Sequence, residues 1–177
     1  LVGAGAYDVH STIKPMSSVM PNYVNWIKEY AESFSPESNS VKTSGGEYSY
    51  DYLVVCPGLK INFDGVAGLK ETLGKNNVCT NYSSDMAVYT WECLKNLKGG
   101  TLLFGVPHFQ GPLNEICDSY GIKRSFQHNL ISVNGEAKEA VFKQSDKDGN
   151  TKEVTKNFDF IHVTPPQTAP DFIKNSP

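Results

Sequence analysis

The feature that most constrains the fold is a near repeat, in which an aromatic residue, an aspartate and a second aromatic residue precede a short, mostly apolar run. The first copy is Y-D-Y-L-V-V at residues 50–55, and the second is F-D-F-I-H-V at residues 158–163. Each copy follows a polar, turn-rich segment and soon meets proline, which cannot donate a backbone hydrogen bond and so ends a strand. The pattern predicts two hairpins, each returning the chain to a central parallel strand whose carboxyl end lies where such sheets bind ligands. The alternative is two unrelated hairpins that share common strand residues.

Composition is that of an ordinary globular protein. The chain has 177 residues, of which 39% are hydrophobic and 20% charged, enough to bury one core or two small ones. Its net charge of −3 gives no basic surface for nucleic acid, so no nucleic-acid partner is expected. No apolar run approaches the roughly 18 residues of a membrane-spanning helix. The sequence opens without Met or a signal-like segment, and any targeting segment is expected upstream of residue 1.

The cysteines and histidines show no metal-binding or redox spacing. No C-x-x-C pair is present, and the histidines fall in separate segments. We therefore expect free thiols in a reducing compartment, no metal site and no catalytic residue among them. Cys56 ends an apolar run and is interpreted as a small buried residue. His162 is interpreted as a hydrogen-bonded core histidine.

Residues 83–98 carry the strongest helix signal. Ser83 or Ser84 can cap the N-terminus, and Gly99 with Gly100 follows the C-terminus. Val88, Trp91 and Leu94 share one side of this predicted helix.

Two further segments complete an α/β pattern. T-L-L-F-G-V-P at residues 101–107 is a continuous apolar run, typical of a strand covered on both faces. Residues 111–120 then predict a short helix with Leu113, Ile116 and Cys117 inward and Gly121 as its stop. A helix leading into such a strand is typical of an α/β fold.

The N-terminal third is less regular. Ser44-Gly45-Gly46 predicts a tight turn between two strands. Residues 22–34 fit either an amphipathic helix or a strand around Trp26 to Ala31, and periodicity alone does not decide between them.

These segments resemble flavoproteins with two dinucleotide-binding domains, and most closely the sulfide:quinone oxidoreductases of the eukaryotic, mitochondrial type. The strings that carry the resemblance include YDYLVVCPG, NYSSDMAVYTWECLKNLKGG and HVTPPQTAPDFIKNSP. The resemblance implies an α/β fold with two incomplete Rossmann-like parts, each with a β-hairpin returning to a central strand. Residues 1–98 would be part of an FAD-binding domain and residues 99–177 part of a second dinucleotide-binding-like domain. A missing segment is expected near residues 108–112, and residues 24–34 are expected to form a strand.

The resemblance also implies a chemistry. It predicts an FAD-dependent enzyme that oxidises hydrogen sulfide, passes electrons to ubiquinone and transfers sulfur to an acceptor. Such an enzyme would be mitochondrial and associated with the inner membrane, whose surface it would touch through a C-terminal part beyond residue 177. The alternatives are a non-catalytic remnant or interaction protein of the same fold and, more distantly, an NADH-dependent flavin reductase.

Three short segments match positions near FAD in the resembling enzymes. The strand backbone at Ala31 would lie at the adenine. The strand end at Cys56, Pro57 and Gly58 would approach the flavin nucleotide. The strand end at Thr164, Pro165 and Pro166 would lie near the isoalloxazine ring. The competing interpretation of each is a strand end that needs a turn.

The chain departs from the family at the positions that carry the chemistry. The G-x-G-x-x-G turn that would hold the FAD pyrophosphate is absent, and the glycines at residues 3–6 do not replace it because no strand precedes them. No cysteine matches either redox position of the family. These 177 residues alone are therefore expected neither to hold FAD tightly nor to reduce quinone with sulfide.

Overall fold

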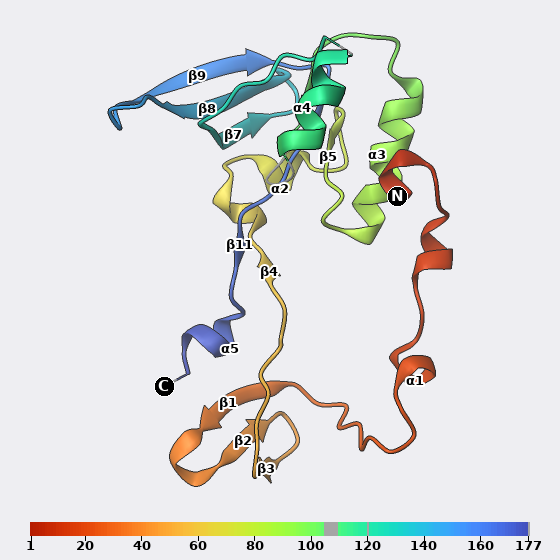
Figure 1. Ribbon diagram of the computed structural model, residues 1–177, viewed down its shortest axis with the longest axis vertical. Coiled ribbons are helices and arrows are strands. Elements are labelled where there is room, and N and C mark those ends of the chain that lie inside the picture. Colours follow the sequence, from red (N-terminus) through yellow and green to blue (C-terminus); the bar gives the residue numbers. More distant parts are fainter. Residues whose placement is uncertain (105–109, 120, 177) are drawn as a thin grey trace. The chain divides into compact units, whose positions relative to one another are not determined.

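The computed structural model describes residues 1–104, 110–119 and 121–176. The chain divides into two compact units, each built from two separate stretches of sequence. The first unit comprises Leu1–Thr12 and Asn62–Pro166, and the second comprises Ile13–Ile61 and Gln167–Pro177. Figure 1 traces the elements of each unit. These boundaries differ from the sequence-based division at residues 98/99, which stays a prediction about the two dinucleotide-binding parts.

The first unit is mixed α/β. Its helices and 3-10 helices are η1 (Val2–Ala4), η2 (Val9–Thr12), η4 (Phe63–Gly65), α2 (Leu69–Thr72), α3 (Ser84–Asn96) and α4 (Gln110–Ser119). Its strands are β5 (Val78–Cys79), β6 (Leu102–Phe104), β7 (His128–Asn134), β8 (Glu139–Ser145), β9 (Thr151–Asn157) and β10 (Phe160–His162).

The parallel sheet of the first unit has the order β5-β10-β6. Its central strand β10 is the second copy of the sequence repeat, and all three of its residues are buried. Ile161 pairs with Val78 on one side and with Leu103 on the other. The predicted strand within residues 158–163 is thus confirmed over Phe160–His162, because parallel neighbours satisfy its backbone on both sides.

The aspartate of the second copy fixes the chain that enters β6. A carboxylate oxygen of Asp159 accepts a hydrogen bond of 2.8 Å from the backbone N–H of Thr101, while the backbone N–H of Asp159 donates to the Thr101 carbonyl. Asn77 donates from its side chain to the Asp159 carbonyl at 2.9 Å. Hydrogen bonds of Asp159 therefore connect β10 to Thr101, which precedes β6, and to Asn77, which precedes β5.

A second sheet, β7-β8-β9, is antiparallel and packs against α2 (Figure 1). The hairpin predicted before the second copy of the repeat is confirmed by the antiparallel pairing of β8 with β9. Val133 of β7 joins Leu69 of α2 and Ile161 of β10 in one buried apolar cluster. This cluster makes the two sheets of the first unit share a core.

The second unit holds small antiparallel sheets. Its elements are α1 (Met16–Val19), β1 (Ala31–Ser35), η3 (Pro36–Ser38), β2 (Ser40–Thr43), β3 (Glu47–Ser49), β4 (Lys60–Ile61), β11 (Gln167–Thr168) and α5 (Asp171–Lys174). The strands pair as β1-β2-β3 and β11-β4. The turn predicted at residues 44–46 is confirmed by the pairing of Lys42 with Glu47. The strand predicted around Trp26 begins only at Ala31, where β2 first offers a partner.

The first copy of the repeat is not a strand, contrary to the prediction. Tyr50 to Val55 carry no strand or helix assignment and are mostly exposed. Tyr52, the counterpart of Phe160, is 95% exposed, whereas Phe160 is 0% exposed. The physical reason is the lack of neighbours, since no described strand pairs with this segment. A hairpin precedes both copies, but in the described residues only the second copy continues into a paired strand.

Both predicted helices are present. Ser83 is the N-cap residue of α3, as expected, but the buried face consists of Ala87, Thr90 and Cys93. Val88 and Trp91, which were predicted to share one side with Leu94, are 39% and 38% exposed, so that side is not the buried one.

The segment around α4 is described only in part. α4 spans Gln110–Ser119, and Gly121 follows it with a φ of 65°. Leu102, the first residue of β6, is 40% exposed, although a strand covered on both faces was predicted. The break predicted at residues 108–112 includes His108 and Phe109, which lie outside the described residues.

Candidate functional site

The carboxyl ends of β5 and β10 form a hydrogen-bonded edge in the first unit. The Thr80 hydroxyl donates to the Val163 carbonyl at 2.8 Å, and the backbone N–H of Val163 donates to the Cys79 carbonyl at 2.8 Å. Thr80 is fully buried and also accepts from the backbone N–H of Tyr82 at 3.2 Å. In parallel α/β sheets this is the edge at which ligands bind, so we take it as the candidate site.

His162 lies at this edge as a neutral core residue. The backbone N–H of Asn81 donates to its Nε2 at 3.0 Å, so this nitrogen carries no hydrogen. Burial lowers the pKa of His162, and a backbone hydrogen bond opposes that shift only in part. The ring is therefore neutral at physiological pH and holds the Asn81 backbone in place, in agreement with its interpretation as a hydrogen-bonded core histidine.

The two cysteines beside the site are protonated thiols. Burial raises the pKa of Cys79 to about 12, with the Cys93 thiol adding to the shift and a hydrogen bond from Thr90 opposing it. Burial likewise raises the pKa of Cys93. Nucleophilic or redox attack requires a thiolate, so neither cysteine is suited to it.

A cavity of about 300 Å³ lies between the N-terminal residues and the start of α3. Gly3 and Thr12 line one side, and Asn81, Ser84 and Ala87 line the other. A side chain at Gly3 would overlap the Asn81 amide, so the Gly3 backbone and the Asn81 side chain lie in close contact. Apart from the amino group of Leu1, the lining offers hydroxyls, an amide and backbone but no titratable side chain. It can bind by hydrogen bonds, but its side chains cannot perform acid–base chemistry.

The glycines at residues 3–6 thus have a packing role. η1 contacts α3, and Gly5, with φ 69°, lies directly against the Trp91 ring. The sequence indicated correctly that these glycines do not form a strand-turn-helix fingerprint. It gave no signal that they pack on α3.

The seven residues expected near FAD divide between the two units. Thr164, Pro165 and Pro166 follow β10 in the first unit, with Pro165 buried and Pro166 exposed. Ala31 begins β1 in the second unit and is half-buried. None of these four residues lines either cavity described here.

The other three residues lie in the second unit, in an extended, exposed segment. Cys56 is an exposed free thiol, not the buried residue that was expected. Gly58 has φ 76°, a conformation that favours glycine. Their proximity to FAD stays a prediction.

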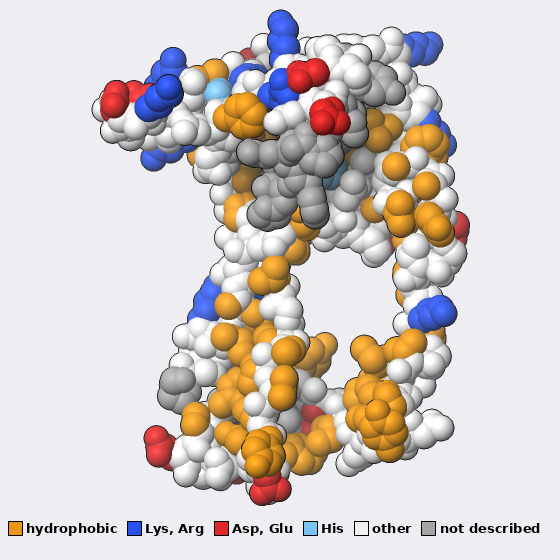
Figure 2. Space-filling model, in the orientation of Figure 1, with side chains coloured by type: hydrophobic (Ala, Val, Ile, Leu, Met, Phe, Trp, Pro, Cys, Tyr) orange, Lys and Arg blue, Asp and Glu red, His pale blue; other side chains and the backbone are white. Residues whose placement is uncertain are grey.

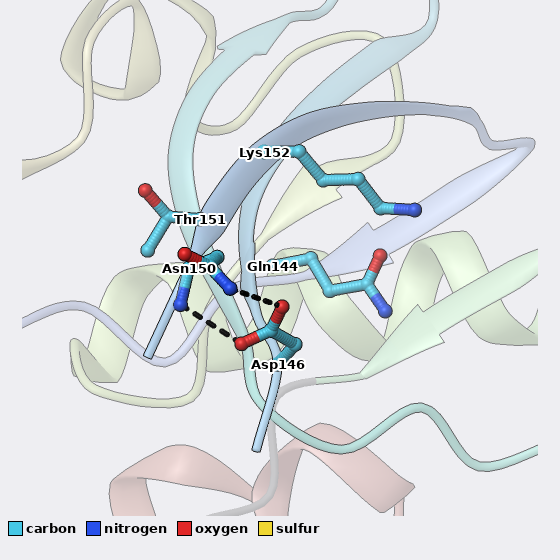
Figure 3. A pocket seen from close by; sticks show the side chains of 5 residues that line it. All are labelled: Gln144, Asp146, Asn150, Thr151 and Lys152. Carbon is cyan, nitrogen blue, oxygen red and sulfur yellow. Dashed lines mark hydrogen bonds between the residues drawn. The ribbon is translucent and has the colours of Figure 1, made fainter. Parts of the chain in front are cut away.

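A second cavity, of about 200 Å³, lies at the turn between β8 and β9. Figure 3 shows the Asn150 side chain turned toward the Asp146 carboxylate. The backbone N–H groups of Asp148 and Asn150 and the side-chain amide of Asn150 all donate to this carboxylate, at 2.8 to 3.0 Å. These bonds hold the pKa of Asp146 below its ordinary value. The carboxylate is therefore used in shaping the turn.

Within residues 1–104, 110–119 and 121–176, no group of three or more His, Cys, Asp or Glu side chains could hold a metal ion. No helix in the same residues has the length and apolarity to cross a bilayer.

Known proteins match this chain over its whole length. A mitochondrial sulfide:quinone oxidoreductase from Dictyostelium discoideum is 33% identical, with 100% of this chain and 48% of that protein covered. A mitochondrial sulfide:quinone oxidoreductase from Mus musculus is 29% identical, and the match covers 100% of this chain and 49% of that protein. The chain is a relative of the mitochondrial sulfide:quinone oxidoreductases. It spans about half the length of the curated relatives it matches, and no family model matches it.

The sulfide:quinone oxidoreductase from Dictyostelium contains residues that this chain lacks within the matched region. The alignment is 224 positions long, 47 more than the 177 residues of this chain. At least that many positions of the relative therefore have no counterpart here.

One solved structure is similar in fold. A chain of the Tetrahymena thermophila mitochondrial ATP synthase F1Fo composite tetramer superposes with a TM-score of 0.70 at 15% identity. The superposition covers 98% of this chain and 56% of that chain. At this identity the similarity concerns the fold alone.

Proposed function

We propose that this chain is part of a flavin-dependent sulfide:quinone oxidoreductase of the mitochondrial type. The observation that carries the proposal is the match of the entire chain to relatives with that name, at 29 to 33% identity. In the complete enzyme, FAD would take two electrons from sulfide and pass them to ubiquinone, with the sulfur going to an acceptor. The compartment would be the mitochondrion, at the inner membrane.

The described residues would contribute framework and hydrogen bonds to that enzyme. The parallel sheet around β10 would present Thr164 to Pro166 toward the flavin, and the second unit would present Ala31 and residues 56–58 toward the nucleotide. Cys79 and Cys93 would remain protonated. Because no cysteine of this chain matches a redox position of the family, two cysteines outside this chain would perform the sulfide chemistry. We further propose that the segment missing near residues 108–112 accounts for much of the 47-position difference from the Dictyostelium relative.

An exchange of segments tests the proposal. The stretch of the Dictyostelium enzyme aligned with residues 128–166 is replaced by the same stretch of this chain, which contains β7 to β10 and Thr164 to Pro166. The hybrid should purify with bound flavin and reduce a soluble quinone in the presence of sulfide. The unmodified Dictyostelium enzyme is the reference.

One variant hybrid and one alternative outcome sharpen the result. Phe160→Asp within the exchanged stretch places a charge in the core and should abolish folding, which shows that the stretch is integrated. A hybrid that folds and binds flavin but does not oxidise sulfide would instead favour the non-catalytic alternative.

A further inference from the structure

Asn134 and Gly135 form the one asparagine–glycine pair in the sequence, at the turn between β7 and β8. Asn134 is exposed and pairs with Glu139, which closes the hairpin. The side-chain oxygen of Asn134 accepts hydrogen bonds from the backbone N–H groups of Glu136, at 3.1 Å, and Ala137, at 3.0 Å. These bonds turn the side chain forward along the chain, toward the peptide nitrogen of Gly135.

Two features of this turn favour attack of the Gly135 nitrogen on the Asn134 side chain. Two N–H groups already donate to the amide oxygen. Donors placed in this way stabilise the negative charge that the oxygen gains when a nucleophile adds to its carbon. Gly135 carries no side chain that would hinder the close approach of its nitrogen. The turn therefore holds an electrophile and a nucleophile of adjacent residues together.

We propose that Asn134 is a site of spontaneous modification, at which the side-chain amide is lost through a cyclic imide. The Gly135 nitrogen attacks the side-chain carbonyl carbon of Asn134 and forms a C–N bond. The bond from that carbon to the side-chain nitrogen breaks, and ammonia leaves with the proton that the Gly135 nitrogen gives up. Water then opens the imide at either carbonyl and gives aspartate or isoaspartate, without oxidation or reduction. Water reaches the imide because Asn134 is exposed.

The two products should affect the hairpin differently. Aspartate keeps the backbone unchanged, and its carboxylate can still accept from the two N–H groups. Isoaspartate leads the backbone through the former side chain and lengthens it next to Val133, which is 4% exposed and donates its N–H to the Ala67 carbonyl at 2.9 Å. A Cβ at Gly135 would lie 3.0 Å from Thr72 of α2, so this turn is closely packed. Isoaspartate should therefore loosen the contact of β7 with α2.

The turn between β8 and β9 provides an internal reference. Asp148 precedes Gly149 there, and Figure 2 shows acidic and basic side chains together at this end of the sheet. An aspartate–glycine pair forms the same imide by losing water, but a carboxylate is a poorer electrophile than an amide. In this turn the N–H groups of Asp148 and Asn150 donate to Asp146. We therefore expect isoaspartate at residue 134 before it forms at residue 148.

Mass spectrometry of the intact 177-residue chain, aged in mildly alkaline buffer, tests the proposal. Trypsin cleavage after Arg124 and Lys138 releases the peptide of residues 125–138. We expect the mass increase of amide hydrolysis at Asn134, and labelling of the same residue by an isoaspartyl methyltransferase. Asn39, which is followed by Ser40, should lose its amide about tenfold more slowly, because a side chain hinders the attacking nitrogen.

Two comparisons separate the turn from the bare sequence. Gly135→Ala should slow the loss of the amide about tenfold. A synthetic peptide of residues 125–138 lacks the folded hairpin, and the folded chain should react at least as fast as this peptide. Equal rates for Gly135→Ala and the wild type, or a folded chain that reacts much more slowly than the peptide, would overturn the proposal.

Urea unfolding measures the consequence. The aged wild-type chain should unfold at a lower urea concentration than the fresh chain, because part of it carries isoaspartate. Asn134→Asp carries only the aspartate product and should unfold close to the fresh wild type. Aged and fresh chains with the same unfolding midpoint, despite isoaspartate at residue 134, would contradict the loosening of β7.

Discussion

Replacing the second aromatic residue of each copy of the repeat by alanine should change the free energy of unfolding strongly in one copy and hardly at all in the other. Phe160→Ala removes a ring that is 0% exposed at the centre of the parallel sheet, and Tyr52→Ala removes one that is 95% exposed. A buried aromatic side chain removes about 150 to 250 Å² from water, worth about 4 to 6 kcal/mol as an upper estimate. Core Phe→Ala substitutions cost about 3 to 5 kcal/mol. We expect that loss in the first unit for Phe160→Ala, and a change within about 0.5 kcal/mol for Tyr52→Ala.

Tryptophan fluorescence during urea unfolding measures this difference. Trp91 lies in the first unit and Trp26 in the second, so a Trp26→Phe background reports on the first unit alone. The free energy of unfolding follows from linear extrapolation. If Phe160→Ala does not fold, Phe160→Leu should fold with a smaller loss of about 1.5 kcal/mol or less. Equal losses for Tyr52→Ala and Phe160→Ala would refute the assignment of one buried and one exposed copy.

Three further predictions concern single residues of known environment. Gly68 has φ 74°, and an added Cβ would overlap the backbone carbonyl of Val133 in β7. A left-handed conformation alone costs a non-glycine residue about 1 to 2 kcal/mol, so Gly68→Ala should lower the free energy of unfolding by more than that. Gly149, with φ 85° and open space around it, is the matched control, and equal losses in urea unfolding would contradict the packing at Gly68. A maleimide should label exposed Cys56 rapidly and Cys79 and Cys93 only on unfolding, and fast labelling of all three would contradict their burial. Because burial raises the pKa of Cys79 from 9.0 to about 12, the folded state keeps a proton that the unfolded state loses above about pH 9. Stability should therefore fall from pH 9 toward 12 by up to about 1.4 kcal/mol per pH unit, and Cys79→Ala should lessen that slope.

Local signals in the sequence predicted much of the first unit. Ser83 and the two glycines after residue 98 bounded α3 closely, because a helix cap and a helix stop depend on nearby residues. The strand at Phe160–His162 and the β8–β9 hairpin were also predicted from local pattern. The buried face of α3 was missed, because it is set by contacts with other elements: Cys93 packs with Cys79 and Phe160, and the Thr90 hydroxyl donates to the Thr80 carbonyl.

The first copy of the repeat shows the limit of such reasoning. Y-D-Y-L-V-V and F-D-F-I-H-V have nearly the same pattern, yet only the second is a strand. Strand formation depends on neighbours that satisfy the backbone, and β5 and β6 supply them only to the second copy. The candidate edge was reached through the fold rule for parallel sheets. Thr80 and Asn81 were not singled out, because they are ordinary polar residues in sequence and their partners Val163 and His162 lie far away in the chain.

The proposed function implies that these 177 residues need the remainder of a sulfide:quinone oxidoreductase to act. The most direct measurement records flavin absorbance near 450 nm and sulfide-dependent loss of a soluble quinone. It is made on the purified chain, with its mass of 19.5 kDa confirmed, and on the hybrid Dictyostelium enzyme that carries residues 128–166 of this chain. We expect a colourless, inactive chain alone, and flavin with turnover in the hybrid. A yellow 19.5 kDa chain that oxidises sulfide by itself, or a flavin-loaded hybrid without turnover, would contradict the proposed function.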